Sequence, residues 1–166
     1  MDRPSTRRVV AALVLAAVAV SLVLPALGGP PTVTVENHDR NRTYRVTAYA
    51  VPDVERPSAL SFHATTDDHR ERVPFEAVYW SGDNDYRNVT VATPSAANET
   101  AIVPAGGNAT VELDGYDREP TVVYVVELAD SERVVHVDTT QCSEPDQTVT
   151  VAMQDGDFQN GTAVCA

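Results

Sequence analysis

Residues 121–128 read TVVYVVEL, and this stretch decides the fold. Its central positions are apolar one after another, and most of them are valine, a β-branched residue that packs well on a pleated surface. An apolar run of this length with no polar face is typical of a strand buried on both sides. Turn-forming residues follow at 129–132, and we expect Arg133–Asp138 to return beside the strand as its hairpin partner.

Other segments alternate between apolar and polar residues with a period of two, as half-buried strands do. The alternation is clearest at Tyr44–Val51 and Thr148–Met153. Further strands are expected at Thr32–Glu36, Ser61–Thr65, Arg72–Trp80, Tyr86–Thr93, Ala101–Val103 and Asn108–Leu113. Turn signals separate these segments and helical periodicity is absent. Residues 32–166 are therefore predicted to form a single antiparallel, all-β sandwich of about eight or nine strands.

Residues 102–113, IVPAGGNATVEL, combine a proline and a glycine pair between two strand-like segments. This stretch resembles the proline-glycine crossover common in immunoglobulin-like modules of bacterial and archaeal surface proteins. The resemblance implies that the sandwich is immunoglobulin-like and that one strand ends, and the next begins, at this crossover.

The N-terminus differs from the rest of the chain. Residues 1–8 contain three arginines and one aspartate, whereas residues 9–27 carry no charge. As a helix, residues 9–27 would be about 28 Å long, close to the roughly 30 Å hydrocarbon core of a bilayer. The basic residues 1–8 are then expected in the cytoplasm. We therefore predict one hydrophobic helix with the lipid bilayer as its partner, a Gly/Pro linker at residues 28–31, and an extracytoplasmic domain.

Two fates are open for this segment. Ala26-Leu27-Gly28 has the small-x-small form cut by signal peptidase, and residues 6–10 resemble a loose twin-arginine export signal. However, residues 9–27 form a longer run than the apolar region of a usual signal peptide. We favour a retained helix at the cell membrane, with secretion after cleavage near Gly28 as the alternative.

Composition indicates the environment. The chain has 12 arginines, no lysine and 24 acidic residues. After residue 28, 9 arginines oppose 23 acidic residues, a net charge of −14. Such a charge repels nucleic acid, so the composition argues against a DNA- or RNA-binding role. An acidic excess without lysine resembles the secreted proteins of extremely halophilic archaea, which implies a carboxylate-rich surface that stays hydrated in concentrated salt.

Asparagine is followed by a hydroxyl residue unusually often. The chain has seven asparagines, and five of them begin an Asn-x-Thr pattern. The five are Asn41, Asn88, Asn98, Asn108 and Asn160. This pattern is the acceptor for N-glycosylation. In an exported domain we expect several of them to carry glycans.

The only two cysteines are Cys142 and Cys165, with 22 residues between them. In an oxidising compartment they are expected to form a disulfide that holds the C-terminal tail against the body of the domain. A blue-copper site would need a histidine shortly after its cysteine, and none follows Cys142. The alternative of two unpaired buried thiols is disfavoured in such a compartment.

No catalytic residue can be assigned. The chain lacks a Gly-x-Ser-x-Gly elbow, a phosphate-binding loop and an H-E-x-x-H helix. His136 and Asp138 would share one face of a strand and could bind a metal weakly, although a solvated strand face fits the same pattern. Asp83 and Asp85 are the best candidate for a calcium-binding loop, although adjacent carboxylates are frequent in so acidic a chain.

Two functional hypotheses follow. The preferred one is a non-enzymatic cell-envelope module of a halophilic archaeon, tethered through residues 9–27 and acting through contacts with an envelope protein or a glycan. The alternative is a secreted β-domain that binds a small ligand or a divalent metal, without a resident cofactor in either case.

Overall fold

The structure is a computed structural model that describes residues 29–67, 69–79, 85–93, 97–114, 120–142 and 147–165. The hydrophobic helix expected at residues 9–27 lies outside these ranges. Within them, no helix has the length and hydropathy that a bilayer crossing requires.

The described residues are mostly strand. The elements are β1 (Thr32–Asn37), β2 (Tyr44–Val51), the 3-10 turn η2 (Pro57–Ala59), β3 (Ser61–Thr66), β4 (His69–Pro74), the short helix α2 (Phe75–Tyr79), β5 (Arg87–Val91), β6 (Ala97–Val103), β7 (Asn108–Glu112), β8 (Thr121–Leu128), β9 (Val134–Gln141), β10 (Gln147–Gln154) and β11 (Asp157–Cys165). The all-β prediction is confirmed, with eleven strands in the described ranges where about eight or nine were expected.

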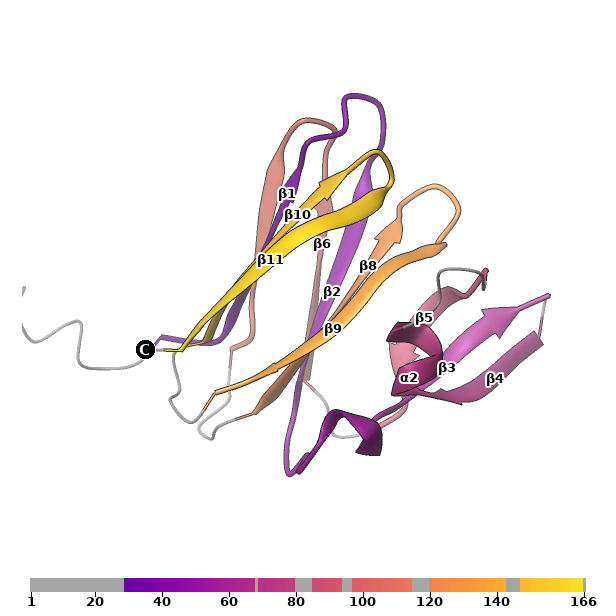
Figure 1. Cartoon of the computed structure of the whole chain (residues 1–166), viewed down its shortest axis with the longest axis vertical. Helices are drawn as coiled ribbons and strands as arrows, with labels where there is room; N and C mark the ends of the chain where they lie inside the picture. Colours follow the sequence, from indigo (N-terminus) through magenta and orange to yellow (C-terminus); the bar gives the residue numbers. More distant parts are fainter. Residues whose placement is uncertain are drawn as a thin grey trace, which may run out of the picture.

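Three sheets form from these strands (Figure 1). Sheet A has the order β11-β10-β1-β7, sheet B the order β6-β2-β8-β9, and sheet C the order β4-β3-β5. The stretch that decides the fold is β8, an interior strand of sheet B in which seven of the eight residues are buried. Its predicted hairpin partner is β9, which pairs with it in antiparallel register.

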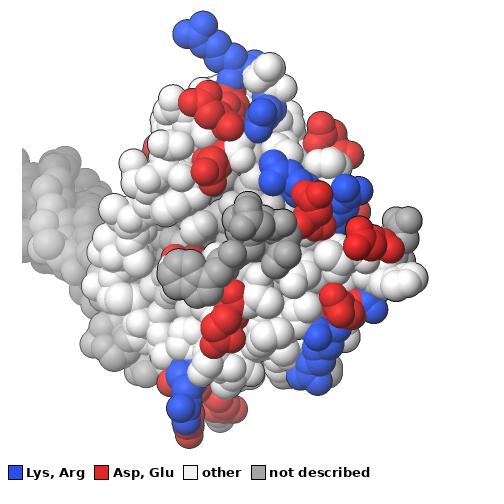
Figure 2. Space-filling model, turned by 45° about the vertical axis from the view of Figure 1, so that its right-hand side comes forward, with Lys and Arg blue, Asp and Glu red and all other residues white. Residues whose placement is uncertain are grey.

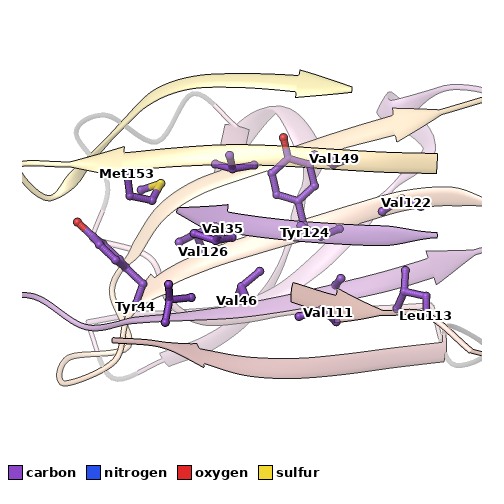
Figure 3. Close-up of a cluster of buried hydrophobic side chains, with 14 of the residues drawn as sticks. Val35, Tyr44, Val46, Val111, Leu113, Val122, Tyr124, Val126, Val149 and Met153 are labelled. Carbon is purple, nitrogen blue, oxygen red and sulfur yellow. The ribbon is translucent and has the colours of Figure 1, made fainter. Parts of the chain in front are cut away.

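Sheets A and B pack face to face and enclose the main core (Figure 3). Alternate residues of each strand point inward, so the side chains of the two sheets meet between them. The buried residues of this core include Val33, Val35, Val46, Val111, Leu113, Val122, Val126, Val149 and Met153. Two tyrosines belong to the same cluster, Tyr44 near one end and Tyr124 nearer the middle (Figure 3).

Sheet C covers the other face of sheet B. Residues 52–93, between β2 and β6, contain all of sheet C together with η2 and α2 (Figure 1). Phe62 of β3 and Val78 of α2 pack in one cluster with Val123 and Val125 of β8. Sheet B is thus the middle of three layers, which explains why β8 has no polar face.

One strand pair departs from the antiparallel prediction. β1 and β10 are parallel, with Thr32 opposite Thr148 and Asn37 opposite Met153. Parallel neighbours need a long connection, and here nearly the whole domain lies between the two strands. Periodicity shows which side chains are buried but not the direction of a partner so distant in sequence.

Residues 72–80 were predicted as one strand, and that was wrong. β4 ends at Pro74, and α2 begins at Phe75. Proline lacks the N–H that a continuing ladder needs and is favoured at a helix start. Phe75 and Val78, three positions apart, are the buried residues of α2, a spacing that places both on one helical face.

β11 was missed because its residues show no apolar alternation. Eight of its nine residues are exposed, and only Phe158 is partly buried. The strand is the edge of sheet A and forms by pairing with β10 along its length.

A buried carboxylate, that of Glu127, joins sheet C to sheet B. Glu127 of β8 is 3 % exposed and accepts hydrogen bonds from Arg45 of β2 at 2.7 and 3.1 Å. Its other carboxylate oxygen accepts the backbone N–H of Val89 in β5 at 3.0 Å. Arg45 also contacts Glu132, whose side chain is 46 % exposed. The Glu127 carboxylate on β8 therefore bonds to β2 in the same sheet and to β5 in sheet C.

Replacing Glu127 should be far more destabilising than replacing Glu132. Glu127→Ala leaves Arg45 without its buried partner and the N–H of Val89 unsatisfied, and we expect a loss of about 3 kcal/mol or more in the free energy of unfolding. Glu132→Ala removes an exposed contact to the same arginine and should change it by less than about 1 kcal/mol. Urea unfolding at a fixed salt concentration measures both variants, and equal losses would contradict this role of Glu127.

Candidate functional site

Cys142 and Cys165 form a disulfide, with their Cα atoms 5.5 Å apart. Cys142 directly follows β9, and Cys165 ends β11. These are the edge strands of sheets B and A, so the bond joins the two layers of the sandwich at one side. It also fixes the exposed strand β11, whose side chains bury little surface.

Opening this bond should destabilise the domain and release its last strand. For a closed loop of this length, the chain-entropy model gives a loss of about 3 kcal/mol. We expect the Cys142→Ser/Cys165→Ser variant to unfold at lower denaturant concentration and to show faster amide hydrogen exchange in β11 than in β8. Unchanged exchange in β11 would mean that pairing with β10 alone holds the tail.

All five predicted glycosylation asparagines are exposed. Asn41 lies in the loop between β1 and β2, and the other four lie on strands. Asn88 is on β5, Asn98 on β6, Asn108 on β7 and Asn160 on β11. Each is accessible to a glycan, and their modification stays a prediction.

A cavity of about 470 Å³ opens where the β10–β11 turn meets the start of β9. Its walls carry charges of both signs. The lining residues are Arg42, Tyr79, Arg133, Val134, Val135, His136, Asp155, Gly156, Asp157 and Phe158. Because arginines and aspartates line it together, the cavity favours neither a simple anion nor a simple cation.

His136 is the most unusual group of this cavity. Its ring stacks on Phe158 of β11 with 4.0 Å between ring centroids, and it also contacts Tyr124 of β8 at 5.7 Å. The Nε2 atom is buried and has no hydrogen-bond partner among the described residues. Burial lowers the pKa of His136, although the charges of Asp138 and Asp157 oppose this shift. The imidazole is therefore held neutral between the two sheets.

The lowered pKa of His136 predicts a pH-dependent stability. The unfolded chain binds the proton near its ordinary pKa of 6.5, whereas the folded protein binds it only at lower pH. The free energy of unfolding should therefore fall as pH drops below about 6.5 and level off below the folded-state pKa. His136→Phe keeps a stacked ring and should lack this decrease. If the free energies of unfolding of the two proteins change in parallel between about pH 7 and 5, the lowered pKa of His136 is contradicted.

The two metal hypotheses gain no support from the described residues. His136 and Asp138 do lie on one face of β9, but Asp138 already accepts hydrogen bonds from Tyr124 at 3.5 Å and the N–H of Thr139 at 2.7 Å. No group of three histidine, cysteine or acidic side chains in the described ranges could hold a metal ion.

Asp83, one half of the predicted calcium loop, lies outside the described residues. Asp85 is described and lines a small cavity of about 260 Å³ together with Thr65, Asp67 and Arg87. The guanidinium of Arg87 in the same cavity opposes a divalent cation there.

Asp39 supports the candidate site from outside the cavity, and the sequence does not mark it. It is 6 % exposed, and its carboxylate accepts the backbone N–H groups of Asp155 at 2.8 Å and Gly156 at 3.1 Å. Tyr44 donates its hydroxyl to the same carboxylate. These bonds fix the β10–β11 turn that forms one wall of the cavity. Only its position in a loop between two strands is visible in the sequence, and that position indicates a turn, not a buried carboxylate.

The charge of Asp39 is stabilised by these bonds. Burial by itself raises its pKa, but the hydrogen bonds from Tyr44, Gly156 and Asp155 more than offset burial, so the pKa is lowered. Burial and the Asp39 carboxylate both raise the pKa of Tyr44, which keeps its hydroxyl protonated as a donor.

The same end of the sandwich is held by Asn37. Its side-chain amide donates to the carbonyl of Arg42 at 2.8 Å and to that of Pro104 at 2.9 Å. Its backbone N–H donates to the carbonyl of Gly107. The β1–β2 loop, the β6–β7 turn and the β10–β11 turn are therefore joined by two neighbouring side chains, Asn37 and Asp39.

Comparison with known proteins decides the family. A family model described as "Halobacterial Ig domain protein" matches residues 4–166. The chain belongs to this family. The halobacterial Ig domain proteins are the group that composition and residues 102–113 indicated, so the predicted resemblance to immunoglobulin-like proteins of halophilic archaea is confirmed.

No curated protein matches this halobacterial Ig domain protein. Among solved structures, "Crystal structure of the human-specific toxin intermedilysin" aligns with 82 % of the chain at 9 % identity and a TM-score of 0.31. The alignment covers 23 % of the toxin, and at this score the likeness carries no argument about fold or function.

Proposed function

We propose that this halobacterial Ig domain protein is a non-enzymatic module of the cell envelope, tethered by residues 9–27 with its sandwich outside the membrane. Membership in an immunoglobulin-domain family supports a non-enzymatic role. The main support for the tether is the uncharged stretch at residues 9–27, which ends shortly before β1 begins at Thr32. The cross-sheet disulfide fits an oxidising exterior.

The topology supports one orientation of the tethered domain relative to the bilayer. Residues 29–31 lead into the start of β1, and the parallel pairing places the start of β10 beside it. The end of β11, at Cys165, pairs with Gln147 at the same end. The tether would therefore hold this end near the lipid. The opposite end carries the turn at Asp39 and the cavity of His136.

Contacts with an envelope protein or a glycan are assigned to this distal end. Three turns held together by Asn37 and Asp39 form a rigid surface there, and rigid loops on a sandwich are suited to binding. Exposed Asn41 lies in the same region and would carry a glycan outward. On the right-hand side of the face in Figure 2, acidic and basic side chains lie next to one another, a mixed pattern that favours hydration.

Fractionation of cells producing the full chain tests the tether. We expect the protein in the membrane fraction, released by detergent but not by low salt or chelator. Placing an arginine at the middle of the apolar segment, as in Val18→Arg, should remove it from that fraction because a charge near the bilayer centre opposes insertion. Ser21→Ala, in the same segment, is the matched control and should remain in the membrane.

Two outcomes separate the alternatives. Recovery of a soluble extracellular protein whose N-terminus begins near Gly28 would mean that residues 9–27 are cleaved off and the domain is secreted. A cytosolic protein with two free thiols would overturn the extracytoplasmic placement altogether.

The ligand-binding alternative depends on His136. Its buried Nε2 has no hydrogen-bond partner among the described residues, and the residue lines a mixed-charge cavity, where we would place a small ligand. Metal analysis of protein purified at molar salt tests the metal form of this alternative. Stoichiometric Ca, Zn or Cu would favour it over the envelope module.

A further inference from the structure

The four predicted glycosylation sites on strands share a position that their sequence pattern does not require. Each of them is on an edge strand of its sheet, namely β5, β6, β7 or β11. The interior strands β1, β2, β3, β8 and β10 carry none of the five acceptor patterns, although threonine is frequent in them.

Three of these sites lie on free edges. Asn98 is on β6, the free edge of sheet B, and faces Tyr49 across the ladder. Asn108 and Asn160 are on β7 and β11, the two edges of sheet A.

Asn108 and Asn160 also share one row of sheet A. Asn108 is opposite Glu36, Glu36 is opposite Ala152, and Ala152 is opposite Asn160. The two asparagines therefore lie at both ends of one row across the sheet, about 14 Å apart at the usual strand spacing.

Asn88 differs from these three. Its backbone N–H donates to the carbonyl of Glu132 at 3.0 Å, and the backbones of Arg87 and Arg133 form an isolated antiparallel β-bridge. The β8–β9 hairpin thus covers β5 at this point, so Asn88 does not lie on a free edge.

The remaining edges have other protection. β4 exposes His69, Arg70, Glu71 and Arg72 in succession, and the cost of dehydrating these side chains, which salt does not screen, opposes pairing at this edge. β9 is largely covered, with seven of its eight residues buried or half-buried, whereas β11 is exposed along its length. Without a modification, β6, β7 and β11 lack a comparable run of charge along the strand.

An open strand edge presents unpaired N–H and C=O groups to any other chain. Proteins in dilute salt often repel partners at such edges with charge. In molar salt the Debye length is about 3 Å, so repulsion between charged edges is screened. A bulky, hydrated glycan blocks an edge by steric exclusion, which does not depend on the salt concentration.

We propose that glycans on Asn98, Asn108 and Asn160 block edge-to-edge pairing of β6, β7 and β11 with a second copy of this chain. This inference rests on the extracytoplasmic placement under the proposed function. Asn41 and Asn88 carry acceptor patterns that have no part in this blocking.

The test compares two sets of variants of the full chain, produced in a halophilic host and purified at molar salt. Asn98→Gln/Asn108→Gln/Asn160→Gln lacks the three edge acceptors. Asn41→Gln/Asn88→Gln is the matched control. Intact mass reports the glycans, and size-exclusion chromatography with light scattering reports the assembly state.

We expect glycan mass on the wild type at the three edge sites. The triple variant should show an increase of about twofold or more in apparent mass as its concentration is raised, whereas the control variant stays at the mass of the wild type. Hydrogen exchange in the associated species should slow in β6, β7 or β11. If the triple variant does not fold, the three single variants should show smaller increases of the same kind.

Three results would overturn the inference. Unmodified asparagines at all three edge sites would remove the blocking group. If the wild type is glycosylated but the triple variant stays monomeric, the glycans do not have this role. If the triple variant associates but hydrogen exchange slows in other strands, the contact does not involve the proposed edges. None of these results bears on the membrane fractionation, so failure here is distinguishable from failure of the tether.

Discussion

The requirement to bury β8 on both faces determines the architecture. Alternate side chains of this strand point in opposite directions, and almost all of them are apolar. One face is covered by sheet A, as in any two-layer sandwich. The other needs a further layer, which the insertion between β2 and β6 provides through sheet C and α2. Glu127 ends this apolar run with the one charged group of the strand, and its bonds to Arg45 and Val89 join the layers at that point.

Local patterns predicted much of the fold. The apolar run of β8 and the alternation of β2 and β10 indicated strands correctly, because each segment carries its own signal of burial. Failures occurred where a strand depends on its neighbour. β11 is polar and forms because β10 pairs with it, and β1 is parallel to β10 because of how the whole chain closes. α2 was hidden because a helix of five residues presents only two buried positions.

The candidate site divides in the same way. The cysteines and the five acceptor asparagines are short patterns, readable without a structure. The cavity is not, because Arg42, His136 and Phe158 come from three separate segments that meet only in the folded domain. Asp39 and Glu127 were missed for a related reason. In a chain with 24 acidic residues, a buried carboxylate is distinguished only by its distant hydrogen-bond donors.

The central place of β1 in sheet A has a mechanical consequence. Tension arriving from the N-terminal side would act on Thr32 and along β1, which is bonded to β10 on one side and to β7 on the other. A pull along the strands loads both ladders in shear, so that many bonds must yield together. An edge strand such as β11, which is bonded on one side only, would oppose the same pull with one ladder in place of two. The domain is thus built to withstand traction at the end from which it would hang.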